Sequence, residues 1–230
     1  MIDKNIDAMV DKAMFGSSAE EKEAGQKEIR ETASSKGIYL ASIQGIYEAA
    51  AAGKYTNKTV PAINVRGLTY DVARTIFRTA AKLNVGAFIF ELARSEMVYT
   101  DQRAPEYVTA ILAAAVKEGY TGPVFVQGDH FQFNKKKYDA DKEAEIKTLY
   151  DGTTSAVKAG FLNIDIDSST LVVLERPTLD EQQKDNYTVA ANMTKFIRSM
   201  EPKGVTISVG GEIGEVGKSN TTVEELRAYM

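Results

Sequence analysis

Short apolar runs alternate with longer amphipathic stretches along most of the chain, starting near Val60. Each run has the length of a strand, and each stretch has the length of a helix. Strands that alternate with helices predict parallel β-α-β units joined by right-handed crossovers. Because such strands are buried on both faces, they are apolar almost throughout. The five runs are residues 62–65, 85–92, 123–128, 161–167 and 205–211.

Residues that start or stop helices delimit the amphipathic stretches. Thr69 can cap a helix over residues 70–83, and Pro105 suits the first turn of a helix that stops at Gly119. The other predicted helices cover residues 142–159, before Gly160, and 179–200, before Pro202, and a last helix begins at Thr221 with Glu224 three residues later.

Residues 1–56 are predicted to form a helical N-terminal extension. Ser18 and Glu21 have the spacing of a capping box before a charged helix. A further helix is predicted from Tyr39 to Ala52, because Gly53 directly follows it. The extension could instead mediate contacts between subunits.

Two architectures fit the alternating pattern, an open doubly wound sheet and a closed (β/α)₈ barrel. The first strand–helix turn, VRGLTYD, lacks the glycine-rich phosphate loop of a dinucleotide-binding fold. Polar residues also follow the carboxyl ends of the runs, and in a barrel these ends converge on one face, where active sites lie. The sequence therefore predicts an α/β fold of the TIM (β/α) barrel type.

The barrel is expected to be incomplete. A full eight-stranded barrel takes about 250 residues, whereas only five strand–helix units are predicted over residues 57–230, the expected catalytic domain. We therefore expect a chain truncated at its C-terminus, with about five of eight units. Such a piece would leave two open parallel edges, so we expect the fragment alone to be marginally stable and inactive.

Composition narrows the class of protein. Of 230 residues, 43% are hydrophobic and 26% are charged, which is ordinary for a globular α/β protein. The net charge of −4 provides no basic excess for nucleic acid, and no run of about 18 apolar residues predicts a membrane span. The absence of cysteine excludes disulfides and thiolate metal ligands, and it fits a reducing cytoplasm.

Histidine and carboxylates cluster at the predicted strand ends. The single histidine, His130, directly follows Asp129, and such groups can bind a divalent ion such as zinc. Asp165 and Asp167 share one face of their strand by the two-residue period. Two buried carboxylates repel unless a cation or hydrogen-bond donors lie nearby. Glu212 follows a glycine pair, and glycine permits close approach of the backbone.

Each of these residues also has a purely structural interpretation. His130 could be a hydrogen-bonded core histidine, and Asp129 could cap a helix or brace a loop. Asp165 and Asp167 could brace a loop together with the hydroxyl residues of the segment SST that follows them. Glu215 and Lys218 fit a solvated loop better than a phosphate site.

Four motifs occur in order at the strand ends: PAINVRG, QGDH, NIDIDSS and GGEIGEVG. Together they resemble the class II, zinc-dependent fructose-bisphosphate aldolases, over about residues 60–230. The resemblance implies a TIM barrel and a lyase that cleaves a carbon–carbon bond. The form QGDHF, the segment EVGKSN and the long N-terminal extension depart from the family pattern, which indicates a divergent branch.

The resemblance also implies roles for individual residues. Asn64 resembles the family's substrate-binding asparagine of the first strand, and Asp129 the catalytic acid/base that moves the proton of the C4 hydroxyl. His130, Asp167 and Glu212 resemble residues of the metal site. Zn²⁺ is the implied cofactor, with another divalent cation or a monovalent cation as alternatives. Two further histidine ligands of the family have no counterpart in this sequence.

The implied reaction is the reversible cleavage of fructose 1,6-bisphosphate to dihydroxyacetone phosphate and glyceraldehyde 3-phosphate, with zinc stabilising the enediolate. It would place the protein in cytoplasmic carbohydrate metabolism, in glycolysis, as a homo-oligomer (dimer or tetramer). The expected partner is a small-molecule sugar phosphate, with no nucleic acid and no membrane. Two alternatives stay open: an aldolase for another ketose phosphate, such as tagatose bisphosphate, and a non-catalytic sugar-phosphate-binding or assembly module.

Overall fold

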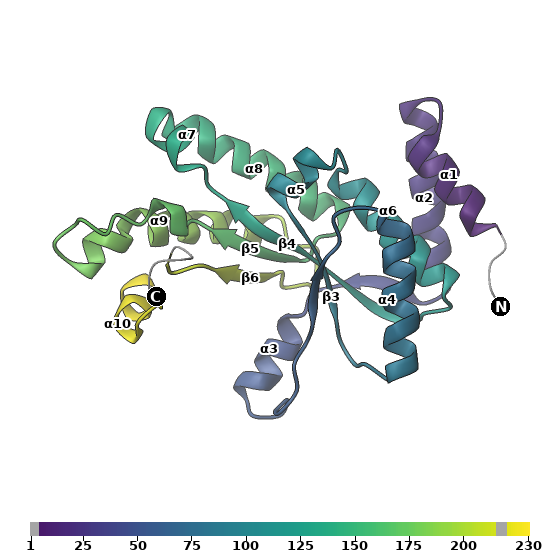
Figure 1. The fold of residues 1–230 in the computed structure, drawn as a ribbon, viewed down its shortest axis with the longest axis horizontal. Helices are drawn as coiled ribbons and strands as arrows, with labels where there is room; N and C mark the ends of the chain where they lie inside the picture. Colours follow the sequence, from purple (N-terminus) through teal and green to yellow (C-terminus); the bar gives the residue numbers. More distant parts are fainter. Residues whose placement is uncertain (1–4, 215–219) are drawn as a thin grey trace.

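A computed structural model describes residues 5–214 and 220–230, in which one parallel sheet is covered by helices (Figure 1). The strands are β1 Ile38–Ala41, β2 Ala62–Asn64, β3 Ile89–Ala93, β4 Gly122–Gln132, β5 Asn163–Asp167 and β6 Ser208–Gly211. The helices are α1 Ile6–Phe15, α2 Ala19–Ser35, α3 Gln44–Ala51, α4 Thr69–Leu83, α5 Arg94–Tyr99, α6 Ala104–Lys117, α7 Lys135–Ala140, α8 Lys142–Ala159, α9 Leu179–Ser199 and α10 Val223–Tyr229, with a 3-10 turn, η1, at Ser169–Leu171.

The main path of the sheet follows the order β2-β3-β4-β5-β6, so each strand pairs with the next one along the chain. All of these pairs are parallel. A doubly wound sheet would reverse its strand order at a switch point, and this path has none. Helix α4 packs against α6, α6 against α8, and α8 against α9. This α/β arrangement is consistent with a TIM-barrel family, while closure of the barrel stays a prediction.

Most elements lie where the sequence pattern predicted them. Each of the five apolar runs overlaps one of the strands β2 to β6, and α8 covers the predicted residues 142–159. Two helix starts differ by one residue. Thr69 is the first residue of α4 rather than its cap, and α10 is capped by Thr222, whose hydroxyl accepts from the backbone N of Glu225.

The helical prediction was wrong for residues 38–41, which form strand β1. This strand pairs in parallel with β4, from Ile38 beside Gly122 to Ala41 beside Phe125. The side chain of Asn163 fastens its end, because Oδ1 accepts from Ile43 N at 2.8 Å and Nδ2 donates to Ala41 O at 3.2 Å. The sheet therefore includes a strand from the predicted N-terminal extension, and its partners lie far along the chain.

The two faces of the sheet carry different side chains. In β3 and β4, alternate residues such as Phe90, Leu92 and Val126 face the helices and join the large apolar core. On the opposite face, Ile89 and Phe125 pack with Ile43 in a small second cluster. Further along this second face lie the polar side chains of Glu91, Gln127 and Asp129, so polar groups gather near the carboxyl ends of β3 and β4.

Candidate metal centre

Polar side chains from neighbouring strands meet at the carboxyl ends of the sheet. Two-residue alternation places Glu91 on the same face as Ile89, and it places Gln127 and Asp129 on the same face as Phe125. The register sets Glu91 beside Gln127, and Gln127 Nε2 donates to Glu91 Oε1 at 2.6 Å. Parallel pairing therefore gathers residues that lie more than thirty positions apart along the chain.

A bulge in β4 brings Asp129 and His130 to this edge together. The pairing of β4 with β5 shifts between Gly128 and Phe131, and His130 adopts a φ of 45°, in the left-handed region. Glycine is needed at position 128, because a Cβ there would lie 2.3 Å from the Phe131 ring. Consecutive residues can therefore approach the same point, and His130 Nε2 lies 3.7 Å from Asp129 Oδ1.

Three carboxylates surround the His130 imidazole. Nδ1 lies 3.0 Å from Asp167 Oδ2 and 3.6 Å from Glu212 Oε1, and Nε2 faces Asp129. Burial lowers the pKa of His130, but the hydrogen bond with Asp167 and the charges of Asp129 and Glu212 outweigh it and raise that pKa. The raised pKa of His130 indicates an excess of negative charge around its ring.

Asp167 is the most constrained carboxylate of the group, with a side chain only 2% exposed. Its Oδ1 accepts from the backbone N of Ser169 at 3.2 Å and from Ser169 Oγ at 2.7 Å. Its Oδ2 accepts from Gln132 Nε2 at 2.5 Å and faces His130. One oxygen thus braces the loop, as the structural interpretation predicted, while the other is directed at the candidate centre.

Two further acids of the centre, Glu212 and Asp165, have raised pKa values. Glu212 follows β6 and is held from outside by α9, where Asn186 Nδ2 donates to the Glu212 carbonyl at 2.9 Å. Burial raises the pKa of Glu212, and the charge of Asp167 adds to the effect. Burial likewise raises the pKa of Asp165 to about 6, with a further contribution from Glu212. A divalent cation among these groups would remove the repulsion that opposes their ionisation.

Asn64 connects Asp129 to a residue that the sequence analysis did not identify. Asn64 Nδ2 donates to Asp129 Oδ2 at 2.7 Å and to Glu96 Oε2 at 3.4 Å. Glu96 is buried and also binds Arg66 and the backbone N of Ala93. Burial raises the pKa of Glu96, but the bonds from Ala93, Arg66 and Asn64 outweigh it and lower that pKa. The only sequence signal for Glu96 was an acid just after an apolar run.

Two groups of side chains among the described residues can converge on a cation, and both include His130. The first contains His130, Asp167 and Glu212, which are the three predicted metal ligands; the second contains Asp129, His130 and Asp165. Within each group the ligand atoms lie within 4.8 Å of one another. Nδ1 faces Asp167 and Glu212, whereas Nε2 faces Asp129.

Glu215 and Lys218 lie outside the described residues, so the solvated loop expected there stays a prediction. Across residues 5–214 and 220–230, no helix combines the length and the apolar character needed to cross a lipid bilayer.

Comparison with known proteins gives one informative result. A search of curated protein sequences found no match. A model of the family described as fructose-bisphosphate aldolase class-II matches residues 41–229. The match includes strands β2 to β6 and every residue of both cation groups, and it supports a metal-dependent aldolase-type function in general. The chain therefore belongs to the class II fructose-bisphosphate aldolase family.

Proposed function

We propose that the protein catalyses the reversible aldol cleavage of a ketose bisphosphate, with fructose 1,6-bisphosphate as the first candidate substrate. The observation that carries this proposal is the convergence of His130, Asp167 and Glu212 beside a hydrogen-bonded Asp129. Family membership supports the class of reaction, and the geometry supports the place at which it would occur.

The donor set fits zinc or a similar divalent ion. His130 offers a nitrogen, and Asp167 and Glu212 offer carboxylate oxygens, which resembles the three-ligand sets of catalytic zinc sites. The His130 side chain is 44% exposed, so a substrate can reach the centre. When bound there, the ion would supply Lewis-acid stabilisation of the negative charge that develops on the substrate carbonyl oxygen.

Asp129 is positioned to move the substrate proton. Its Oδ2 accepts from Asn64, and its Oδ1 points toward His130 Nε2. A carboxylate that is held through one oxygen can use the other to take the hydroxyl proton as the carbon–carbon bond breaks. In the condensation direction the same oxygen returns the proton.

Asn64 has two tasks in this scheme. Its Nδ2 orients Asp129, while Glu96 fixes the amide from the other side. Within the described part of the chain Asn64 Oδ1 accepts no hydrogen bond, so this oxygen can accept from a substrate hydroxyl. Asn64 would therefore bind the substrate and also hold the acid/base in place.

The test is cleavage of fructose 1,6-bisphosphate with and without a chelator. Activity should disappear on chelation and return with zinc. The variant Asp129→Ala should lose turnover and still bind zinc, because the ligand set does not require Asp129. Unchanged turnover in this variant would refute the acid/base role, and sugar-phosphate binding without any turnover in the native protein would favour a non-catalytic module.

A further inference from the structure

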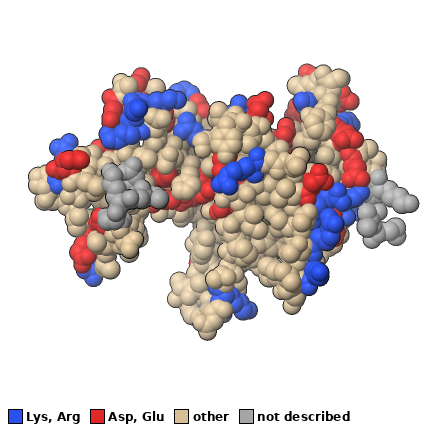
Figure 2. Space-filling view, in the orientation of Figure 1, with Lys and Arg blue, Asp and Glu red and all other residues tan. Residues whose placement is uncertain are grey.

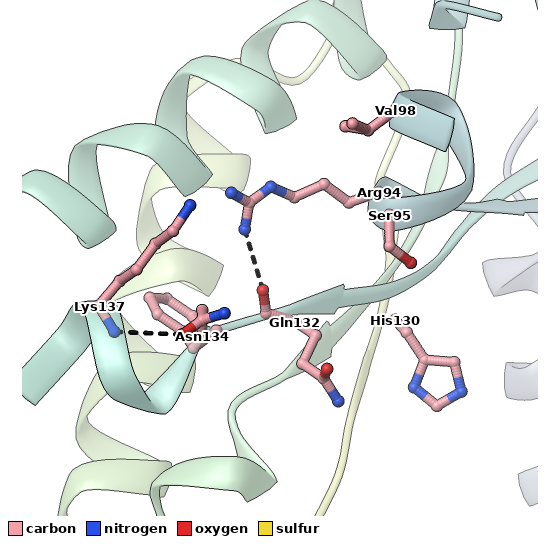
Figure 3. A pocket seen from close by; sticks show the side chains of 8 residues that line it. Arg94, Ser95, Val98, His130, Gln132, Asn134 and Lys137 are labelled. Carbon is pink, nitrogen blue, oxygen red and sulfur yellow. Dashed lines mark hydrogen bonds between the residues drawn. The ribbon is translucent and has the colours of Figure 1, made fainter. Parts of the chain in front are cut away.

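A pocket of about 300 Å³ opens directly beside the candidate metal centre (Figure 3). It lies between α5, the end of β4 and the start of α7, and His130 forms part of its wall. Its polar lining includes Arg94, Ser95, Asn134 and Lys137. The two positively charged side chains come from different helices, Arg94 from α5 and Lys137 from α7, and they reach toward one another in Figure 3.

Arg94 is held rigidly at the pocket wall. Its Nη1 donates to the backbone carbonyl of Gln132 at 3.0 Å and lies 3.4 Å from Glu145 Oε1. The Glu145 side chain is buried, and its Oε1 also accepts from the backbone N of Asn134 at 3.0 Å. In the described part of the chain Arg94 Nε and Nη2 donate no hydrogen bond, so these two nitrogens are available to an anion.

Lys137 supplies a positive charge beside the ion pair that Arg94 forms with Glu145. Within residues 5–214 and 220–230 its ammonium forms no ion pair, whereas Lys135, in the same helix, pairs with Asp139 at 2.7 Å. Figure 2 shows Lys and Arg side chains gathered over the region of α7. An arginine held by two oxygen acceptors together with an unpaired lysine of the described chain is a combination suited to a phosphate dianion.

The candidate metal centre next to the pocket is lined by acidic side chains. Asp129, Asp167 and Glu212 surround His130, and they would repel a phosphate placed among them. Gln132 separates the two regions, because its side-chain amide donates to Asp167 and its backbone carbonyl accepts from Arg94. A ligand with a neutral, hydroxyl-bearing part and a dianionic end would find complementary surfaces on the two sides of His130.

We propose that the pocket formed by Arg94, Ser95, Asn134 and Lys137 binds a phosphate dianion of the sugar-phosphate substrate. The assignment of this phosphate to a ketose bisphosphate rests on the proposed function, but the presence of an anion site does not. Lys137 would act as a substrate-binding residue that contributes affinity without taking part in proton transfer.

The first measurement uses inorganic phosphate and the only histidine of the chain. His130 lines the pocket, so its ring resonance in an NMR titration reports anion binding without overlap from other histidines. Saturable binding is expected for the native protein. Lys137→Gln should weaken it about tenfold, the loss expected for one charge-assisted bond. Acetate at equal ionic strength should bind more weakly than phosphate.

A matched control lies one residue away. Lys136→Gln makes the same change of charge in the same exposed helix, but Lys136 does not line the pocket. It should leave the phosphate affinity unchanged. Arg94→Lys retains a positive charge beside buried Glu145 and removes the planar fork, so it should weaken binding while the fold is retained. Equal weakening by Lys136→Gln and Lys137→Gln, or binding that does not saturate, would overturn the proposal.

A second measurement separates this proposal from the proposed function. For an active enzyme, Lys137→Gln should raise KM for fructose 1,6-bisphosphate about tenfold and leave kcat nearly constant. If the protein cleaves the bisphosphate but Lys137→Gln changes neither KM nor phosphate affinity, the pocket assignment fails. If Lys137→Gln loses phosphate affinity in a protein that shows no cleavage, the anion site stands and the proposed function fails.

Discussion

Replacing Asp167 by asparagine tests the candidate metal centre most directly. The side chain keeps its shape, so Oδ1 can still accept from Ser169 N and Oγ, now 3.2 Å and 2.7 Å away. The new amide nitrogen would take the place of Oδ2, which now accepts from Gln132 Nε2 and faces His130 Nδ1. The amide nitrogen of Asn at position 167 would then face the amide nitrogen of Gln132, so that hydrogen bond would be lost. The carboxylate oxygen that could bind the metal ion would be lost as well.

The size of the effect follows from these contacts. Loss of a group that only orients a metal ligand lowers metal affinity by about 10-fold to 100-fold. Because Asp167 is itself a predicted ligand, we expect the upper end, about 100-fold in zinc affinity or about 2.7 kcal/mol. Independently of metal, the pKa of His130 should fall, because the hydrogen bond with Asp167 is the leading contribution that raises it.

Two assays measure these changes. Competition with a chromophoric chelator gives the zinc affinity, and the NMR titration of the single histidine gives its pKa. Asp165→Asn is the matched control, since Asp165 shares the strand face but belongs to the other cation group. If zinc affinity fell in Asp165→Asn and not in Asp167→Asn, the ion would bind on the Nε2 side of His130, and the ligand assignment would be refuted.

Three further changes test the fold and the electrostatics. Gly128→Ala should destabilise the protein by about 1–3 kcal/mol, because the added methyl group would overpack against Phe131. Gly152→Ala, in open space within α8, is the control and should stabilise the protein by about 1 kcal/mol. Equal midpoints of urea unfolding for both variants would contradict the bulge geometry. Burial, and then the charges of Asp129 and Asp165, raise the pKa of Glu91 to about 7. The protonated Glu91 therefore stabilises the folded protein at low pH, and this contribution is lost as the pH rises from about 4.5 through about 7. The loss should amount to at most about 3 kcal/mol; Glu91→Gln should remove it, and urea unfolding of both proteins at about pH 5 and about pH 8 checks the difference. Thr153→Val should stabilise the protein by about 1 kcal/mol in thermal unfolding, because Thr153 Oγ1 is buried without a hydrogen-bond partner in the described structure, and a clear loss of stability would show that the hydroxyl is satisfied.

The centre itself was only partly accessible from the sequence. Asp129, His130, Asp167 and Glu212 could be proposed because polar residues interrupt or follow apolar runs at strand ends. Glu96 could not, because its importance comes from contacts with Asn64 and Arg66 in another part of the chain. The pocket at Arg94 and Lys137 was also out of reach, since its residues come from α5 and α7, which α6 and β4 separate along the chain.

The sequence by itself determined the elements whose signals are local. The helix over residues 142–159 ends at Gly160, which adopts a φ of 103° that glycine tolerates without strain. The five apolar runs predicted β2 to β6, because burial on both faces leaves a continuous apolar stretch that needs no knowledge of partners.

Only the tertiary structure decided where β1 belongs and how His130 is oriented. Ile38–Ala41 is a strand because β4 supplies hydrogen bonds to it and Asn163 holds its end, although its local pattern predicted a helix. The bulge at Gly128 depends on the packing of Phe131 and on the register with β5. Hydrophobic periodicity records which residues are buried, whereas register and side-chain direction depend on pairings between distant segments.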